Sequence, residues 1–409
     1  VDGNAKHNAD AVLRCRARMA AAKKAGGDEF RELAGIWRKS IEEIDGDWPF
    51  PGPEPSKREE ARKRHGTAEG PLPLHEVEAR FPGSTWRAIE RFGVTQGETA
   101  AGDPKVRSID DARRNRTNEA YHPRERVSMP RGTYMATMTR EYHKRGVRGP
   151  VGGGCDDESD AFRNSACRQP GLTVVIVADP ESGEVFGFVP RGHNFGLRSA
   201  PSTYAAKPEF VCAVARRLFA AAVDHYVDDY ASCEPLFALG PEVPPADARE
   251  RDAKALRRPW STQGVLFRVA YTLGAPVSFD KHEPWSLEPT VIGVTSDLRT
   301  AHEDGRMVLR CKASTRKKVV ALIDQHLASR RMTAAEAASL AGKCQWALLY
   351  GRVGKAALQP ITRRQYEPGD LRSSAISDDL AKALGRLRRL FESDDARIVL
   401  RVASPTPQA

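Results

Sequence analysis

Two adjacent carboxylates interrupt a stretch of sequence that is otherwise typical of a β-strand. Asp228 and Asp229 lie among Tyr226, Val227 and Tyr230, and aromatic and β-branched residues favour strands whereas acidic residues do not. Two neighbouring anions repel each other, so the pair indicates either a solvated turn or a site that attracts positive charge. Carboxylate oxygens are the hard ligands that Mg²⁺ prefers, and a divalent cation would explain why the repulsion is tolerated.

A second acidic cluster lies earlier in the chain. The segment CDDESDAFRN, residues 155–164, holds Asp156, Asp157, Glu158 and Asp160. Phosphoryl transfer to a growing strand needs little covalent help from a protein, but it uses two divalent cations about 3.5–4 Å apart that grip the attacking and leaving oxygens. An acidic pair at one strand and an aspartate on another would supply their ligands. Because each cluster alone is more often a surface loop, further motifs are needed to decide.

Three segments resemble, in chain order, the motifs of the reverse transcriptases. DESDAF at 157–162 is similar to the family's Asp-x-x-x-Ala-aromatic motif, HNFGLRSAPSTY at 193–204 to its Pro-Phe-Gly-Leu-x-Ser-Ala-Pro-x-x-aromatic motif, and YVDD at 226–229 to its Tyr-x-Asp-Asp motif. The likeness extends over about residues 75–365, is strongest over 155–230, and points to a eukaryotic retroelement. It implies an α+β fold, a right-hand polymerase with fingers, an antiparallel-sheet palm and a helical thumb.

The resemblance also implies a metal site. Asp157 and Asp228 would be ligands shared by two Mg²⁺ ions, Asp229 a supporting ligand, and the backbone carbonyl of Glu158 a further contact. Phe162 follows Asp157 at the spacing of the family motif, which sets the register of the acidic cluster. The three aspartates are therefore the predicted catalytic residues, and Mn²⁺ is expected to substitute for Mg²⁺.

Three further residues are implied to shape the nucleotide site. Phe162 would lie beneath the sugar and exclude a 2′-hydroxyl, which favours deoxynucleotides, and Phe195 and Gly196 would form the floor under nucleotide and template. The plainer alternatives are that Phe162 is an ordinary core residue and that Gly196 is only a turn residue.

Basic residues are implied to meet the triphosphate and the active site. The segment KVRSIDDARRNRTN resembles the basic fingers motif, in which Lys105 and Arg107 would contact the incoming triphosphate. Lys281, in SFDKHEP, would lie near the active site, and residues 291–297, VIGVTSD, resemble the hairpin that grips the primer end. Each of these cations could instead be an ordinary exposed charge.

The elements that must position these residues are visible in the hydrophobic pattern. Residues 172–190 predict a hairpin because a β-branched run and a second apolar run flank the turn sequence DPESG. Residues 209–223 predict a helix, with apolar residues recurring at helical spacing on one face, namely Val211, Val214, Leu218 and Ala222. Residues 1–48 read as helical, 49–58 as a Pro-rich break, and 289–297 as a strand.

The chain changes character beyond residue 313. One predicted helix carries Val319, Leu322, Ile323 and Leu327 on one face, and a second begins with Thr333 and Glu336 at the spacing of a capping box. Residues 311–364 contain eleven Lys and Arg against two Asp and Glu, which favours contact with nucleic acid over a merely solvated helix face. Trp346 and Tyr350, on one helix face, are expected to be core residues rather than a stacking platform.

These patterns predict five regions along the chain. They are an N-terminal helical extension at 1–58, a fingers-like region at 59–150, a palm with the carboxylates at 151–300, a basic helical thumb-like region at 301–365, and a connector at 366–409 that ends before any ribonuclease H-like domain. The first residues lack an initiator Met and a signal-like apolar segment, so the sequence reads as an excerpt from a longer protein.

Two segments depart from the family pattern. Gly152, Gly153 and Gly154 precede the first acidic motif, where the family usually has a hydrophobic strand, and successive glycines weaken a strand. His193 and Asn194 stand where the family has an apolar residue and, often, proline. These departures fit either a divergent enzyme or a decaying copy of an element.

Composition agrees with a nucleic-acid enzyme without requiring one. The 409 residues carry a formal net charge of +10, and 29% of them are charged; a basic balance suits a polyanionic partner, although many basic proteins bind none. The longest apolar run is too short to span a bilayer, and seven scattered cysteines with no CxxC pair indicate an intracellular, reducing compartment. We expect no membrane association, and nothing in the sequence decides the oligomeric state.

The function predicted from these observations is template-directed DNA synthesis. The partners would be an RNA or DNA template with its primer and deoxynucleoside triphosphates, and the enzyme class an RNA-directed DNA polymerase. Three alternatives stay open at this point: a catalytically degenerate module that only binds nucleic acid, an RNA-dependent RNA polymerase, and a basic structural protein in which the motif order is chance.

Overall fold

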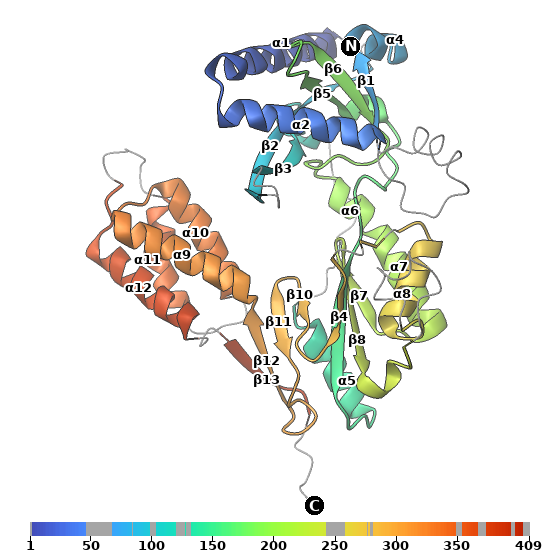
Figure 1. Cartoon of the computed structure of the whole chain (residues 1–409), viewed down its shortest axis with the longest axis vertical. Helices are drawn as coiled ribbons and strands as arrows, with labels where there is room; N and C mark the ends of the chain where they lie inside the picture. The colour runs from blue at the N-terminus through green and yellow to red at the C-terminus, as the bar shows by residue number, and fades with distance from the viewer. Residues whose placement is uncertain are drawn as a thin grey trace, which may run out of the picture. The chain divides into compact units, whose positions relative to one another are not determined.

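The chain folds as β-sheets and helices, an α+β fold in which one pair of neighbouring strands is parallel and the other described pairs are antiparallel (Figure 1). The structure is a computed structural model that describes residues 2–45, 68–83, 85–98, 104–119, 127, 132–242, 258–275, 277–278, 281–348, 354–366, 374–393 and 397–403. The predicted Pro-rich break at 49–58 lies outside these residues. None of the helices in the described ranges is long and apolar enough to cross a membrane.

The chain divides into two compact units that interleave along the sequence. The first unit comprises Val1–Ser128, Glu158–Phe210 and Tyr271–Pro276, and the second comprises Met129–Asp157, Val211–Ala270 and Val277–Ala409. The division falls between Asp157 and Glu158, inside the first acidic motif.

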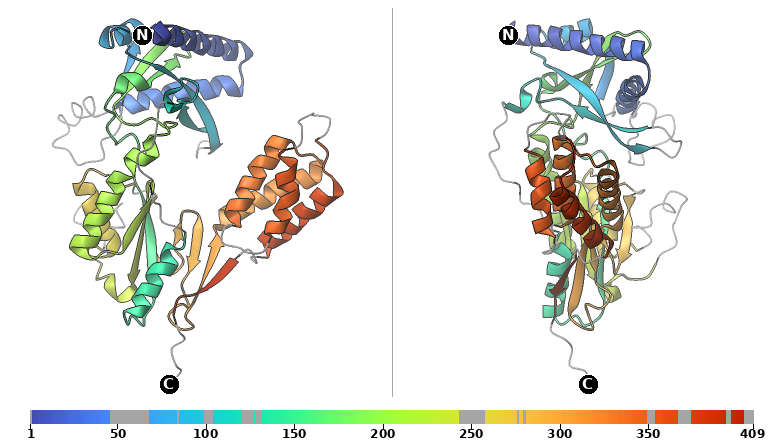
Figure 2. Two further views of the ribbon diagram at one scale, coloured as in Figure 1. Left: turned by 180° about the vertical axis from the view of Figure 1, so that it is seen from behind. Right: turned by 90° about the vertical axis from the view of Figure 1, so that its left-hand side faces the viewer.

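The first unit is a five-stranded sheet packed against two long helices. The strand order is β1-β6-β5-β2-β3, with β1 at Ala68–Pro73, β2 at Ala88–Glu98, β3 at Pro104–Asp110, β5 at Val174–Ala178 and β6 at Val185–Pro190. Helices α1 (Asp2–Ala25) and α2 (Asp28–Asp45) contribute to one core cluster with the sheet, and α4 (Leu74–Arg80) adds Val77 (Figures 1 and 2). The predicted helices in 1–48 are thus confirmed.

Buried hydrogen bonds also hold α1 against this sheet, in addition to the apolar contacts. The side-chain amide of Asn8 donates to the carbonyl of Trp86 at 3.1 Å, and its oxygen accepts from the backbone of Ala88 at 2.9 Å. Both contacts are buried, so the helix cannot slide along the strand without breaking them.

The predicted hairpin at 172–190 is confirmed as β5 and β6. The strands pair antiparallel, with Val175 opposite Phe188. The turn forms because the Asp179 carboxylate accepts from the backbone of Glu181 and Ser182, and Gly183 takes a positive φ of 77°, which glycine adopts without a steric penalty.

The second unit contains the antiparallel sheet that carries the aspartates. Its strand order is β7-β8-β4-β9, with β4 at Val151–Asp157, β7 at Val223–Tyr226, β8 at Asp229–Pro235 and β9 at Glu283–Ser286. Helix α5 (Tyr134–Lys144) packs Met135 toward β4 at Gly153, and α8 (Thr262–Thr272) packs Gln263 toward the neighbouring Gly154. Because successive residues of a strand face opposite sides, the two helices contact opposite faces of β4.

The triple glycine does not prevent the strand from forming, contrary to what the sequence suggests. All three glycines are buried within β4, and an added Cβ would lie 2.4 Å from the Ser286 carbonyl oxygen at Gly152 and 2.3 Å from the Ser232 carbonyl oxygen at Gly153. Glycine is therefore required here because neighbouring backbone approaches the strand too closely for any side chain. This run is a packing feature of the sheet and no longer counts as evidence of decay.

The helix predicted at 209–223 forms, but its buried face was predicted wrongly in part. Helix α7 spans Ala206–Phe219, so Ala222 lies beyond it, and Leu218 is 72% exposed. Val211 is buried as expected, together with Cys212 and Ala215. The helix ends early because Ala220 adopts a positive φ of 52°. On the buried face of the helix lies the small side chain of Ala215, whereas the larger Leu218 is exposed.

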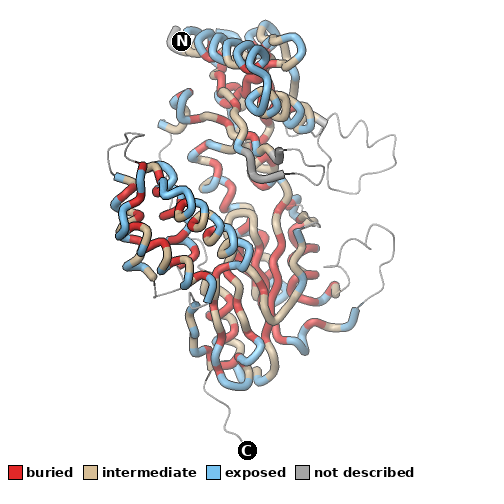
Figure 3. The backbone as a smooth tube through the Cα atoms, turned by 60° about the vertical axis from the view of Figure 1, so that its left-hand side comes forward, coloured by how far each residue is buried: buried red, intermediate tan, exposed pale blue. Residues whose placement is uncertain are grey.

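The rest of the second unit is a four-stranded sheet followed by a helical bundle. The strand order is β10-β11-β12-β13, with bounds Thr290–Val291, Val294–Asp297, Arg306–Cys311 and Arg397–Arg401. The single strand predicted at 289–297 is instead a hairpin of β10 and β11, because the chain reverses at Ile292 and Gly293, both of which have a positive φ. The bundle consists of α9 (Ala313–Ser329), α10 (Ala334–Ala347), α11 (Leu358–Arg364) and α12 (Asp378–Glu392). Buried positions lie along the strands and on the inward helix faces (Figure 3).

Two predictions about these helices are confirmed and one is wrong. Val319 and Ile323 are buried in the bundle core, and Thr333 and Glu336 form the reciprocal hydrogen bonds of a capping box. Trp346, expected in the core, is 38% exposed, because the inward face of α10 is filled by small residues such as Ala337, Ala341 and Cys344. Tyr350 lies outside the described residues.

Candidate active site

Strand pairing brings two of the predicted catalytic aspartates face to face. In the β4–β8 ladder Asp157 is the direct partner of Asp229, and Asp228 lies in the two-residue turn that joins β7 to β8. The turn holds Val227 at a φ of 55°. A β-branched residue rarely adopts this left-handed conformation, which costs about 1–3 kcal/mol, so the turn is a strained point of the sheet.

The electrostatics of this ladder end show that the carboxylates crowd one another. Burial, together with the nearby charges of Asp228 and Asp157, raises the pKa of Asp229 to about 6, whereas Lys281 acts in the opposite direction. Like charges that share a site disfavour ionisation in this way. A positive charge at this point would relieve the repulsion.

Lys281 supplies one such charge. Its Nζ lies 2.5 Å from Oδ1 of Asp157, although the side chain of Lys281 is 62% exposed. The adjacent His282 is hydrogen-bonded through Nδ1 to the buried Asp156 at 2.6 Å, and Gln263 donates to the other oxygen of Asp156 at 3.1 Å. Asp156 therefore anchors the Lys281 segment to β4, whereas Asp157 pairs with Asp229.

The carboxylates match a hard divalent cation in donor chemistry. Asp157, Asp228 and Asp229 offer anionic oxygens at one sheet end, and the raised pKa of Asp229 reflects negative charge in excess there. As placed, however, no group of three or more His, Cys, Asp or Glu side chains in the described part of the chain is arranged to hold a metal ion. The Asp157 carboxylate is engaged by Lys281 instead.

The side chain of Glu158, which belongs to the first unit, is used for a different purpose. Its carboxylate is buried and accepts from the hydroxyl of Tyr204 and from Nζ of Lys207, both at 2.6 Å. Glu158 therefore joins the start of the acidic motif to helix α6 (Ala200–Tyr204) and to α7, and both of its side-chain oxygens are engaged.

The predicted nucleotide-binding aromatics lie together in the first unit. The ring of Phe162 makes edge contacts with those of Phe195 and Tyr204, at centroid distances of 5.4 Å in both cases. The guanidinium of Arg107, on β3, lies over the Phe195 ring at 6.0 Å. Phe162 is half-buried and packs against a small apolar cluster, whereas the Lys105 side chain lies outside the described residues.

Gly196 occupies a position that admits no side chain. Its φ is 107°, and an added Cβ would lie 2.1 Å from the carbonyl oxygen of Asp110. The backbone of Asp110 also donates to the carbonyl of Phe195 at 2.8 Å, and the Asn118 amide donates to the carbonyl of Gly196 at 2.9 Å. Phe195 and Gly196 are thus held against the end of β3 by these contacts.

The structure gathers the predicted site residues into two groups. Asp157, Asp228, Asp229 and Lys281 belong to the second unit, whereas Phe162, Phe195, Gly196 and Arg107 belong to the first. Sequence reasoning missed the residues that support both groups, which are Asp110, Asp156, Arg163, Tyr204, Lys207, Gln263 and His282. Of these, Tyr204 carried a signal as the aromatic end of a motif and Asp156 as a member of the first acidic cluster, but neither was assigned its supporting role.

Comparison with known proteins identifies the architecture. No protein-family model and no curated protein matches the sequence. Among solved structures, the foamy viral protease-reverse transcriptase dRH in complex with double-stranded DNA matches with a TM-score of 0.51 at 13% identity, over 83% of this chain and 48% of that one. The chain has a reverse-transcriptase-like fold. It spans about half the length of that viral protein, and identity this low shows the fold alone.

Two other structures of the foamy viral protein match at lower scores. The complex with an RNA/DNA hybrid has a TM-score of 0.48 at 14% identity, over 82% of this chain and 36% of that one. The complex with double-stranded DNA has a TM-score of 0.49 at 12% identity, over 84% and 56%.

Proposed function

We propose that the chain is an RNA-directed DNA polymerase from a eukaryotic retroelement, which extends a primer on an RNA or DNA template. The observation that carries the proposal is the register pairing of Asp157 with Asp229, next to Asp228, in a chain with a reverse-transcriptase-like fold. Paired carboxylates at a strand end are what two-metal nucleotidyl transfer requires. The foamy viral neighbours were solved in complex with DNA or an RNA/DNA hybrid, which supports a nucleic-acid partner.

In this proposal the chain's own residues position the metal ions and select the nucleotide. Asp157 and Asp228 are the main ligands for two Mg²⁺ ions, with Asp229 and the carbonyl of Glu158 in support. When bound, the ions would activate the primer 3′-hydroxyl and neutralise charge on the phosphates. Lys281, whose Nζ contacts the Asp157 carboxylate, is in this proposal a basic residue near the active site.

Selection of the nucleotide is proposed for the first unit. Phe162 excludes a 2′-hydroxyl by its ring, Phe195 and Gly196 form the floor, and Lys105 and Arg107 bind the triphosphate. The regions 59–150, 151–300 and 301–365 would then act as fingers, palm and thumb, with the basic bundle holding the template and primer.

Primer extension tests the proposal directly. Wild-type protein, given an RNA template, a DNA primer, deoxynucleotides and Mg²⁺, is expected to extend the primer, and Asp228→Asn is expected to abolish extension. Asp224→Asn, the same change two residues before the end of β7, is the matched control and should retain activity. Absence of extension by folded wild-type protein that still binds the template and primer would contradict the enzyme and favour a binding module. Extension with ribonucleotides would identify an RNA polymerase instead.

A further inference from the structure

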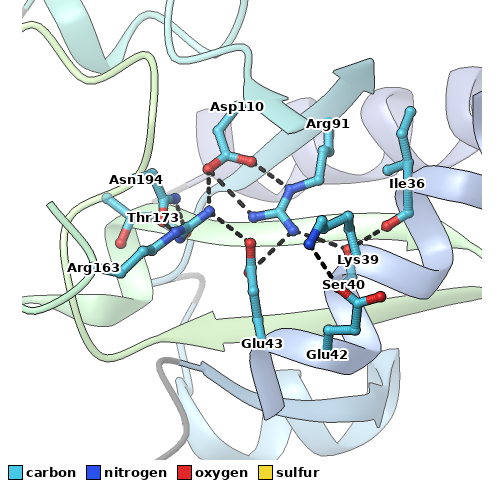
Figure 4. A network of polar contacts seen from close by, with 10 residues as sticks. All are labelled: Ile36, Lys39, Ser40, Glu42, Glu43, Arg91, Asp110, Arg163, Thr173 and Asn194. Atoms are coloured by element: carbon cyan, nitrogen blue, oxygen red, sulfur yellow. Dashed lines mark hydrogen bonds and ion pairs between the residues drawn. The ribbon is translucent and has the colours of Figure 1, made fainter. Parts of the chain in front are cut away.

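A largely buried network of four charged side chains, Arg91, Asp110, Arg163 and Glu43, lies in the first unit (Figure 4). Arg91 on β2 donates to both oxygens of Asp110, at 2.6 and 3.4 Å, and Arg163 donates to Asp110 at 3.1 Å. Both arginines also reach Glu43 of helix α2, at 3.1 and 3.2 Å. Two cations and two anions balance, which is the condition under which buried charges are tolerated.

Three of the four members of this network are almost completely removed from water, whereas the side chain of Glu43 is 17% exposed. The side chains of Arg91 and Asp110 are 0% exposed, and that of Arg163 is 3% exposed. Burial acts against the charged form of Arg91, but Asp110 and Glu43 outweigh it and hold the pKa of Arg91 above its ordinary value. Loss of one member would therefore leave the opposite charges of the network without their partner.

Arg163 connects this network to the two predicted substrate segments. It directly follows Phe162, and its second terminal nitrogen donates to the Asn194 side chain at 2.6 Å; Asn194 directly precedes Phe195. Asn194 in turn donates to the carbonyl of Thr173 at 2.9 Å, and the backbone of His193 donates to the carbonyl of Phe162 at 2.9 Å.

These contacts explain a departure that the sequence left unexplained. Proline, the residue often found at this place in the family, has no side-chain oxygen to accept the Arg163 hydrogen bond, whereas Asn194 does so inside the protein with no exposure to solvent. Arg163 and Asn194 therefore act as a pair, and each would leave a buried polar group unpaired without the other.

We propose that Arg163 is a positioning residue for nucleotide selection, which sets the ring of Phe162 against that of Phe195 through Asn194, Asp110 and Glu43. The inference rests on the proposed function, and it makes helix α2 part of the support of the nucleotide site through Glu43. Asp110 completes the arrangement because its backbone holds the carbonyl of Phe195 while its carboxylate holds Arg163. A displaced Phe162 ring would no longer exclude a 2′-hydroxyl.

Three variants of the full chain test this role. Arg163→Gln removes the charge and the two-pronged contact, Asn194→Ala removes one partner while it keeps all four charges, and Arg163→Lys keeps the charge. Arg18→Gln is the matched control, since Arg18 also pairs with two glutamates of the first unit, but on the surface. Asn194→Ala keeps the test decisive if Arg163→Gln does not fold.

Hydrogen exchange gives a readout that needs no enzymatic activity. We expect the amides of His193 and Asp110 to lose protection by about tenfold or more in Arg163→Gln and Asn194→Ala, but not in Arg18→Gln, while the helical bundle of the second unit is unchanged. Unchanged protection in folded Arg163→Gln and Asn194→Ala would overturn the proposal, whether or not the wild type extends primers.

Single-nucleotide kinetics then separate positioning from a general structural role. With a wild type that extends primers, we expect discrimination against ribonucleotides to fall about tenfold in Arg163→Gln, mainly through a lower KM for the ribonucleotide, with partial rescue in Arg163→Lys. Discrimination equal to that of Arg18→Gln would overturn the role in selection. If the wild type does not extend primers, only the proposed polymerase activity is contradicted. Hydrogen exchange still tests whether Arg163 and Asn194 hold the two segments in place.

Discussion

Gly153→Ala is the sharpest test of how β4 is built. The added Cβ would lie 2.3 Å from the carbonyl oxygen of Ser232 on β8 and 2.4 Å from Cε of Met135 on α5. Met135 can rotate, but the Ser232 oxygen is backbone in the paired strand, so β4 and β8 would have to separate by about 1 Å. Overpacking costs about 1–3 kcal/mol, and two weakened ladder hydrogen bonds cost about 1 kcal/mol each.

These terms predict a loss of about 3–5 kcal/mol in the free energy of unfolding of the second unit. At about 2–4 °C per kcal/mol for a unit of this size, its thermal midpoint should fall by roughly 10 °C, measured by scanning calorimetry. Primer extension should fall with it, because Asp157 and Asp229 pair on the displaced strands.

The control is a glycine whose neighbourhood is open. Gly342, in α10 of the same unit, has nothing within 4 Å of an added Cβ, so Gly342→Ala should stabilise the helix by about 0.5–1 kcal/mol. If Gly153→Ala proved as stable as Gly342→Ala, the close approach of β8 would be refuted. The glycine run would then again indicate sequence drift.

Three further predictions concern pH, helix capping and metal. Both buried ring nitrogens of His193 lack a hydrogen-bond partner in the described structure, and burial lowers the pKa of this residue. The contribution of His193 to stability is therefore present above about pH 6.5 and is lost as the pH falls. The thermal midpoint of His193→Leu should decrease less than that of the wild type between pH 7.5 and pH 5, and an identical decrease would contradict this. Thr333→Ala should cost about 1 kcal/mol in urea unfolding by removing the cap of α10, whereas Thr333→Ser should not. Mg²⁺ at a hundred times its Kd should stabilise the wild type by about 2.7 kcal/mol and leave Asp228→Asn unchanged; an equal shift in both would place the ion elsewhere.

Local elements were predictable because their signals lie within a few residues of one another. The DPESG turn and its flanking apolar runs define the β5–β6 hairpin, and the spacing of Thr333 and Glu336 defines the start of α10. The errors arose where tertiary packing chose among local options. Leu218 has the spacing of a core residue, yet α7 ends one residue later and Leu218 is exposed, whereas Ala215 is buried.

The sequence by itself determined which side chains could do chemistry, because the three acidic and aromatic motifs occur in the order of a known family. It also indicated a strand that an acidic pair interrupts at Asp228 and Asp229, since aromatic and β-branched residues favour strands locally. The two-residue turn itself, with Val227 at a positive φ, came from the structure. Only the tertiary structure decided that Asp157 faces Asp229, that the glycines before it make room for β8, and that Arg163 meets Glu43. The physical reason is that these contacts join segments far apart in the chain, and their energy comes from desolvation and close packing that no local pattern records.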